Sequence, residues 1–185
     1  FAAVSSSDEY DDYGLELYRL VVRYATQKTE TRIGLQKIAF GPAIVLRSLM
    51  WFDSIDPRDP QQLTSGVSAL RFRYDALDNS SLWLWGIWPD GEIKGLEIIP
   101  SEKGYLESGG RYVRPVPAGY MAVTFNSRQA GLPSYDLDFR ENRFALDGKW
   151  DLGAGLWFEA VMQHQDEDLL PAPWSKMLTV GTDYT

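Results

Sequence analysis

Basic side chains are the residues of this sequence whose placement could most directly do chemistry. A guanidinium stays charged at any relevant pH and fits carboxylates and phosphates as a two-pronged donor. Basic residues recur inside segments that alternate between polar and apolar, so they would share one face of a sheet. Such a face predicts one of two roles for the basic residues. They could line a solute path that favours anions, or they could form ion pairs that brace the sheet, with acids such as Asp147, Glu159 and Asp183 as partners. The candidate lumen-facing or solute-facing residues are Arg19, Arg23, Arg32, Arg71, Arg73, Arg128, Arg143 and Lys149.

A second candidate region is the long predicted link 41–64. It starts with the apolar run 44–46 and 49–52, and it continues as Ile-Asp-Pro-Arg-Asp-Pro at 55–60. The two prolines fix φ and favour extended or turn geometry. The apolar start favours a link folded over the mouth of a barrel, although a plain surface loop stays open as an alternative. The candidate mouth-loop residues are Asp53, Asp56, Arg58 and Asp59.

Several kinds of chemistry have little support in the composition. The chain has no Cys and one His, His164, which leaves no thiolate chemistry and no His-rich metal site. No phosphate-binding glycine loop or zincin motif is present, and no pair of carboxylates stands out as a glycosidase site. The net charge of −8 argues against general nucleic-acid binding. We therefore expect no enzymatic activity, no cofactor, no metal and no nucleic-acid partner.

The elements that position these residues are predicted to be strands. Period-two alternation is common, and 14% of the residues are aromatic, which favours a pleated, half-buried surface. In one segment, for example, Leu70 and Phe72 alternate with Arg71 and Arg73. The nine predicted strands are 16–26, 31–40, 65–76, 81–88, 108–115, 120–128, 142–151, 156–165 and 174–184.

The lengths of the connections alternate in a regular way. Four short links, 27–30, 77–80, 116–119 and 152–155, alternate with four longer ones, 41–64, 89–107, 129–141 and 166–173. Short turns on one side and longer loops on the other are typical of outer-membrane barrels, whereas a Greek-key sandwich has no reason to alternate so strictly. The fold class predicted is all-β, an antiparallel up-and-down transmembrane β-barrel with about nine strands. Residues 1–185 would form one barrel domain or a segment of a larger barrel.

Aromatic residues cluster near the predicted strand ends. Such belts are favoured at the two membrane–water interfaces, because the rings are apolar with a polar handle. The residues beside the short links are Tyr24, Tyr74, Tyr120, Trp150 and Trp157, and those beside the long links are Tyr18, Phe40, Trp88 and Trp174.

The stretch Thr31 to Pro60 resembles porin-like outer-membrane β-barrel proteins of Gram-negative bacteria, including the alginate-export type. The matching positions are Arg32, Gly34, Gln36, Phe40, Gly41 and 56–60. The resemblance implies a location in the bacterial outer membrane and a barrel considerably longer than this chain. It therefore favours a fragment, and the odd number of predicted strands agrees, because bacterial single-chain barrels have an even number. A complete barrel of eight or ten strands is the alternative.

Three functional hypotheses follow. The first is a porin-like channel or exporter that passes polar solutes, with anions as the candidate class. Its partners would be the lipid bilayer, small polar or anionic solutes, and missing strands of the same protein or another chain. The second is a secreted all-β carbohydrate-binding module with a sugar-stacking platform of Trp83, Trp85, Trp88 and Trp157. The third is a structural barrel that anchors a surface complex and conducts nothing.

Overall fold

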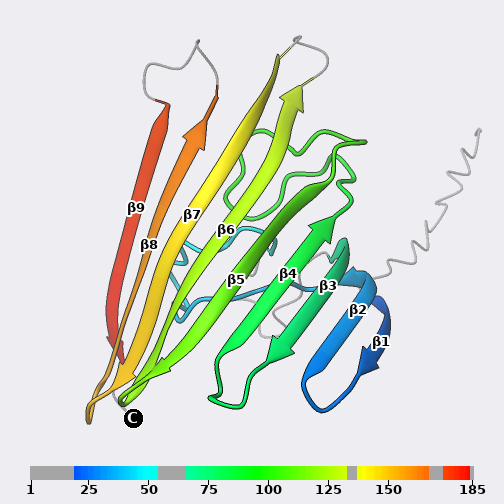
Figure 1. Cartoon of the computed structure of the whole chain (residues 1–185). Helices are drawn as coiled ribbons and strands as arrows, with labels where there is room; N and C mark the ends of the chain where they lie inside the picture. Colours follow the sequence, from blue (N-terminus) through cyan, green and yellow to red (C-terminus); the bar gives the residue numbers. More distant parts are fainter. Residues whose placement is uncertain (1–18, 54–65, 133–136, 167–172, 184–185) are drawn as a thin grey trace, which may run out of the picture.

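The computed structural model describes residues 19–53, 66–132, 137–166 and 173–183. These residues form nine strands and no helix (Figure 1). The strands are β1 (Leu20–Ala25), β2 (Thr29–Gln36), β3 (Val67–Asp75), β4 (Ser81–Ile87), β5 (Glu107–Val116), β6 (Gly119–Leu132), β7 (Leu137–Asp151), β8 (Gly155–Gln165) and β9 (Trp174–Asp183).

The strands form one antiparallel sheet in which each strand pairs with its neighbours in the chain. The order runs from β1 to β9 without a crossover, so the predicted all-β, up-and-down arrangement is confirmed. Within the described residues, β1 pairs only with β2 and β9 only with β8. The sheet is therefore open, with two free edges that run in the same direction.

One predicted connection was wrong. The segment 129–141 was predicted as one of the longer links, but β6 and β7 continue through most of it and leave only 133–136 between them. The two strands are 14 and 15 residues long, and their pairing extends to Leu132 and Leu137. Two apolar side chains inside the segment, Ala130 and Phe139, are buried, and this burial outweighs the weak local strand propensity.

The turns 26–28, 76–80, 117–118 and 152–154 lie together at one end of the sheet, the lower end in Figure 1. Two of them use a non-glycine residue with positive φ, namely Asn79 before β4 and Ala118 before β6, each at 61°. This left-handed conformation is common for Asn and unusual for Ala. The Ala118 carbonyl accepts a hydrogen bond from the Asp151 amide of β7, at 2.8 Å, which joins this turn to the neighbouring strand.

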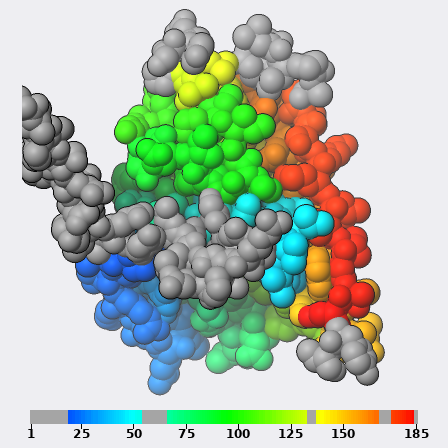
Figure 2. Space-filling view, turned by 180° about the vertical axis from the view of Figure 1, so that it is seen from behind, coloured from blue at the N-terminus to red at the C-terminus, as the bar shows by residue number. Residues whose placement is uncertain are grey.

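The two faces of the sheet differ in what lies over them. The links 37–53 and 88–106 fold back over one face, which we call the covered face (Figure 2). The opposite face, which we call the bare face, carries exposed apolar side chains on every strand. The alternation of polarity along each strand produces this division, because successive side chains point to opposite faces.

The hydrophobic core lies between the covered face and the link 37–53. Phe40 stacks on Trp85 of β4 with ring centroids 5.7 Å apart, and it meets Trp51 and Phe52 edge-on at 5.8 and 6.0 Å. Ile38, on the same link, is fully buried in this cluster. The apolar residues of the link thus hold it against the sheet.

Candidate functional site: the charged covered face

The covered face divides into two regions of different electrostatic character. Over β5 to β8 most of its charged side chains are buried beneath the links and pair with one another, and we call this region the braced half. Over β1 to β3 lies a group of basic residues with few acids, which we call the basic cluster. Its members are Arg23, Arg32, Lys37, Arg71 and Arg73.

A bidentate ion pair lies at the centre of the braced half. Both terminal nitrogens of Arg111 donate to the carboxylate of Asp147, at 2.6 and 2.7 Å, and one of them also donates to Thr124 Oγ1 at 2.8 Å. Asp147 is 0% exposed and Arg111 is 4% exposed. The guanidinium of Arg111 also lies over the ring of Phe40, 5.1 Å from its centroid. The pair therefore ties β5 and β7 to the link 37–53.

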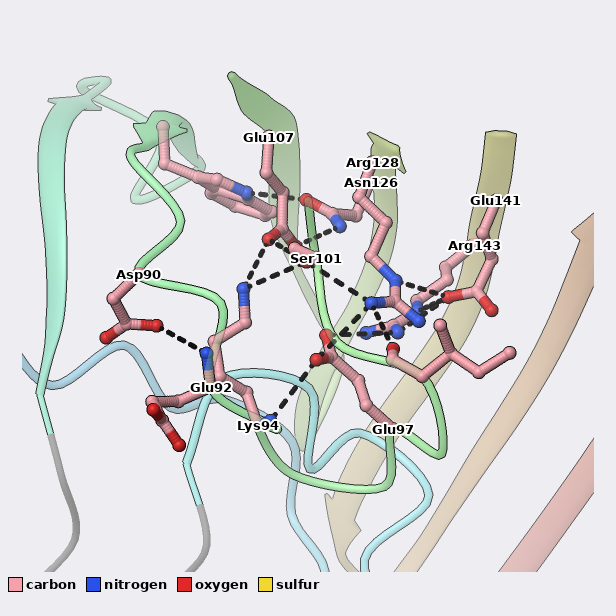
Figure 3. A network of polar contacts seen from close by, with 12 residues as sticks. Asp90, Glu92, Lys94, Glu97, Ser101, Glu107, Asn126, Arg128, Glu141 and Arg143 are labelled. Carbon is pink, nitrogen blue, oxygen red and sulfur yellow. Dashed lines mark hydrogen bonds and ion pairs between the residues drawn. The ribbon is translucent and has the colours of Figure 1, made fainter. Parts of the chain in front are cut away.

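Glu97 brings the link 88–106 into the same network (Figure 3). Its carboxylate lies 3.3 Å from Arg128 and 3.2 Å from Arg143, and both guanidiniums also contact Glu141, at 2.7 and 2.6 Å. Burial raises the pKa of Glu97 above its ordinary value, although Arg128, Lys94 and Arg143 oppose the shift. The two arginines and two glutamates form a closed cluster in which opposite charges balance.

A second chain of contacts joins the same link to β4, β5 and β6 (Figure 3). Lys94 Nζ donates to Glu107 Oε2 at 2.6 Å and to Ser101 Oγ at 3.2 Å. Glu107 Oε1 accepts from Asn126 Nδ2 at 2.7 Å, and Asn126 Oδ1 accepts from the Trp85 indole at 2.9 Å. These buried groups satisfy one another's hydrogen-bonding capacity, and a fully satisfied buried network rigidifies the region it joins.

The link 37–53 reaches across the sheet as far as β8 and β9. The two carboxylate oxygens of Glu159 accept the backbone amides of Ala43 and Leu49, each at 3.0 Å. Ser48 Oγ lies 2.6 Å from Thr179 Oγ1 of β9. Glycine is required at position 41, where φ is +94° and an added Cβ would lie 2.3 Å from Glu159.

The basic cluster centres on one carboxylate, Glu30 of β2. Glu30 is within 2.6 Å of Arg23, 2.7 Å of Arg32 and 3.0 Å of Arg71. With Lys37, and with Arg73 paired to Asp75 at 2.8 Å, five cations stand against two carboxylates among the described residues, a formal +3.

Trp83 of β4 gives the basic cluster an aromatic floor. The guanidiniums of Arg71 and Arg73 lie over its ring, 5.1 and 5.3 Å from the centroid. Within the described part of the chain, Arg71 Nε and Trp83 Nε1 are buried donors without a hydrogen-bond partner. A hollow of about 450 Å³ opens beside the cluster, lined by Arg19, Val21, Arg23, Arg32, Gln36 and Lys37. The excess positive charge beside this hollow is what would attract an anion, whereas the two unpartnered donors are buried and do not line it.

The predicted site residues divide between these regions. Arg128 and Arg143 lie on the covered face, but they are buried in the braced half and pair with Glu141. Lys149 pairs with Asp183 at 2.7 Å near the short-turn end. The other predicted basic residues, Arg19, Arg23, Arg32, Arg71 and Arg73, belong to the basic cluster or line its hollow.

The predicted mouth loop is only partly described. Asp53 is buried and accepts from Arg47 at 2.7 Å, so it folds back onto its own link. Asp56, Arg58 and Asp59 lie outside the described residues.

Sequence reasoning missed several charged residues of the covered face. Each lies on the covered face of its strand or within a link. Alternation along a strand could have placed Glu107 on the same face as Arg111, and Glu141 on the same face as Arg143. The missed residues are Glu30, Glu97, Glu107, Arg111 and Glu141.

The four tryptophans considered as a sugar-stacking platform do not share an exposed plane. Trp85 is buried in the core, and Trp83 lies beneath two guanidiniums. Trp157 lies on β8, separated from β4 by three strands. Comparison with known protein families, with curated proteins and with solved structures finds no significant match, so the geometry of the two faces is the basis on which a function can be assigned.

Proposed function

We propose that this chain forms part of the wall of an outer-membrane β-barrel, in which the bare face meets lipid and the covered face lines a porin-like channel or exporter for polar, anionic solutes. In the described residues no helix is long and apolar enough to cross a membrane.

The observation that carries the proposal is the apolar bare face. Cross-strand partners on this face are apolar in successive pairs, such as Val22 with Ile33, Ile33 with Leu70, and Val123 with Leu146. Val22 is 71% exposed and Val123 is 52% exposed. Large contiguous apolar patches are rare on soluble monomers, and lipid is a partner that would cover all nine strands. The exposed apolar side chains of this face are Leu20, Val22, Tyr24, Ile33, Leu70, Tyr74, Leu82, Leu84, Tyr112, Val123, Phe125, Phe144, Leu146, Leu156, Met162, Trp174, Leu178 and Val180.

The aromatic residues at the strand ends support this orientation in part. Tyr24, Tyr74 and Trp150 lie on bare-face positions next to the short turns, where an interfacial belt would lie. Tyr120 and Trp157, in contrast, lie on the covered face, because both pair with Lys149, which lies on that face. The belt is thus made by fewer residues than the sequence suggests, and Phe40 belongs to the core instead.

The basic cluster supports anion selectivity. The braced half has its arginines matched by buried carboxylates, so it adds little net field to a lumen. The basic cluster retains a formal excess of positive charge beside an open hollow, and fixed positive charge biases a pore toward anions. The solute path in this proposal runs beside β1 to β3 rather than through the braced half.

Ion selectivity in planar bilayers tests the channel proposal. Under a salt gradient, the assembled protein should show a reversal potential of the sign expected for anion preference. Arg71→Gln and Arg73→Gln, which each remove one charge inside the cluster, should each weaken this preference. Arg114→Gln removes one charge outside the cluster and is the control, because Arg114 is exposed near a short turn and pairs with Met121. Cation preference in the wild-type protein would refute the selectivity claim.

A second candidate, a barrel that braces or anchors and conducts nothing, is favoured by one observation. The links 37–53 and 88–106 fill the covered face over β5 to β8 and are held by buried ion pairs. A correctly assembled protein that shows no conductance would favour this candidate.

A further inference from the structure

We propose that the bare face over β5 to β9 binds a phosphate-bearing lipid, whose acyl chain lies in an apolar hollow of the sheet and whose phosphate is held by Arg140, His164 and Lys176. We call these three residues the basic rim. The inference rests on the proposed function, because it takes the bare face as the membrane face. It adds which class of lipid that face selects and where the headgroup of the lipid lies.

The site for the acyl chain is a hollow of about 600 Å³ on the bare face. Gly110 of β5 and Ala160 of β8 line it among larger apolar residues, and their small size leaves the space. The larger lining side chains include Val123, Phe125, Phe144 and Met162, which are 41–52% exposed. The hollow therefore opens away from the sheet, towards the side on which lipid would lie.

The bare face changes from apolar to polar directly beyond this hollow. Cross-strand pairing places Phe125, Phe144 and Met162 in one row, and Ser127, Asn142 and His164 in the next row towards the long links. From the first row to the short turns, the bare-face residues of β6, β7 and β8 are all apolar. Residues two apart on a strand are separated by about 7 Å, so the change is abrupt. Such a boundary, shared by neighbouring strands, is where a hydrocarbon interior would meet lipid headgroups.

The basic rim crosses this boundary on three neighbouring strands. His164 of β8 pairs with Trp174, and the two rings are 4.6 Å apart. Lys176 of β9 lies two positions after Trp174, and Arg140 of β7 lies two positions before Asn142, the other partner of His164. Both cations are therefore diagonal neighbours of His164 on the same face. Diagonal neighbours lie about 7–8 Å apart, within reach of long side chains, so all three can approach one phosphate.

The hollow and the rim are joined through Met162. Its side chain lines the hollow, and its partner on β9 is Lys176. A lysine stem can lie along an apolar surface while its ammonium group reaches the polar boundary. A lipid whose chain fills the hollow would thus bring its phosphate to the rim, which a free phosphate ion could not do by the same apolar contacts.

The charges around the rim favour an anion on the side that faces the hollow. Arg140 and Lys176 are exposed, and neither side chain forms an ion pair within the described residues. Two carboxylates lie on the opposite side of the rim. Asp138 precedes Arg140 on β7 and accepts from Gln129 at 3.2 Å, and the Asp166 amide donates to the Arg140 carbonyl, which sets Asp166 level with Arg140. Both acids are thus farther from the hollow than Lys176, and guanidinium and ammonium groups are strong donors to phosphate.

Lipid binding in nonionic detergent micelles tests the proposal, because micelles require no insertion into a bilayer. The chain has no native cysteine, so a fluorophore on Leu178→Cys, whose cross-strand partner is Ala160, reports an acyl chain in the hollow. The probe is phosphatidylglycerol with brominated acyl chains, which quench the fluorophore, and the midpoint of quenching gives the affinity. The two comparisons are diacylglycerol with the same brominated chains and inorganic phosphate added as a competitor.

Phosphatidylglycerol should bind at least about tenfold more tightly than diacylglycerol, and Lys176→Gln should weaken its binding by about tenfold, the change expected for the loss of one charge-assisted hydrogen bond. Ala160→Phe, which fills the hollow, should also weaken binding, and Ala160→Leu repeats this test if Ala160→Phe fails to fold. Arg114→Gln is the matched control, because it removes a cation from the same face at the short-turn end, and it should leave the affinity unchanged. Excess inorganic phosphate should not displace the lipid.

Four results would each overturn the proposal. Equal affinity for the two lipids, or an affinity that Lys176→Gln does not alter, would show that the rim holds no lipid phosphate. An affinity that filling the hollow does not alter would show that no acyl chain lies there, and displacement by inorganic phosphate would show that the rim takes a free anion. Membrane insertion is a separate measurement: a protein that binds the lipid in micelles but does not enter bilayers would refute the barrel-wall proposal alone, and one that inserts without lipid preference would refute this inference alone.

Discussion

The substitution Asp147→Asn should destabilise the protein far more than its small change in volume suggests. Asp147 is fully buried and receives two hydrogen bonds from Arg111, at 2.6 and 2.7 Å. Replacing the carboxylate with an amide leaves a buried guanidinium without a compensating charge. Breaking a buried pair by removing one partner typically costs about 3–5 kcal/mol, so we expect the free energy of unfolding to fall by about that amount.

The control is the same substitution at an exposed pair on the same face. Lys149 and Asp183 lie 2.7 Å apart, but their side chains are 38% and 42% exposed. Exposed pairs are worth about 0–1 kcal/mol, so Asp183→Asn should have a small effect. The double variant Arg111→Met with Asp147→Leu should recover much of the loss, because it leaves no unpaired charge.

Urea titrations at 25 °C, followed by tryptophan fluorescence in detergent micelles, would give the unfolding free energies of these variants. The result that would refute the bracing role is an Asp147→Asn variant that loses no more stability than Asp183→Asn. The double variant also separates bracing from selectivity, since it should leave the ion preference of an assembled channel unchanged.

Three further results are expected. Val22→Arg and Phe72→Arg should each cost about 2–4 kcal/mol of folding free energy in bilayers if they face mid-membrane; folding into vesicles as efficient as that of the wild type would show that the face assignment is wrong. Arg71→Gln combined with Arg73→Gln should move the reversal potential toward zero in a salt gradient, and an unchanged potential would remove the basic cluster from the solute path. For Glu97, the raised pKa means that the folded state binds the proton more tightly than the unfolded chain. Its contribution to stability is therefore greatest below its ordinary pKa of 4.5 and is lost as pH rises through the folded-state pKa. The difference in unfolding free energy between wild type and Glu97→Gln should accordingly fall with rising pH, and a difference that is flat or rises would contradict this assignment.

The strands could be predicted from the sequence because one local signal determines them. Alternation such as Leu70, Arg71, Phe72, Arg73 fixes both the strand and the face to which each residue belongs, and the observed register agrees with it. The ends of β6 and β7 could not be predicted in the same way, since Gly131 and Pro133 are local turn signals and the pairing that overrides them is between strands.

The division of the covered face into two regions was not visible in the sequence. Arg71 and Arg143 have the same local pattern, yet one belongs to a region with excess positive charge and the other is matched by Glu97 and Glu141. The difference arises because the link 88–106 folds back and carries Glu97 onto β6 and β7. Such a contact joins residues 46 positions apart, and no short-range periodicity encodes it.

The measurement that tests the central claim most directly is the environment of the bare face in a bilayer. Single-cysteine variants Val123→Cys and Leu178→Cys on the bare face, and Ser175→Cys on the covered face, would be labelled with an environment-sensitive fluorophore and reconstituted into vesicles. We predict that nitroxide-labelled lipids quench the labels at positions 123 and 178 and that a water-soluble quencher reaches the label at position 175. Labels at positions 123 and 178 that are quenched from water and not by lipid would contradict the assignment of the bare face to the membrane.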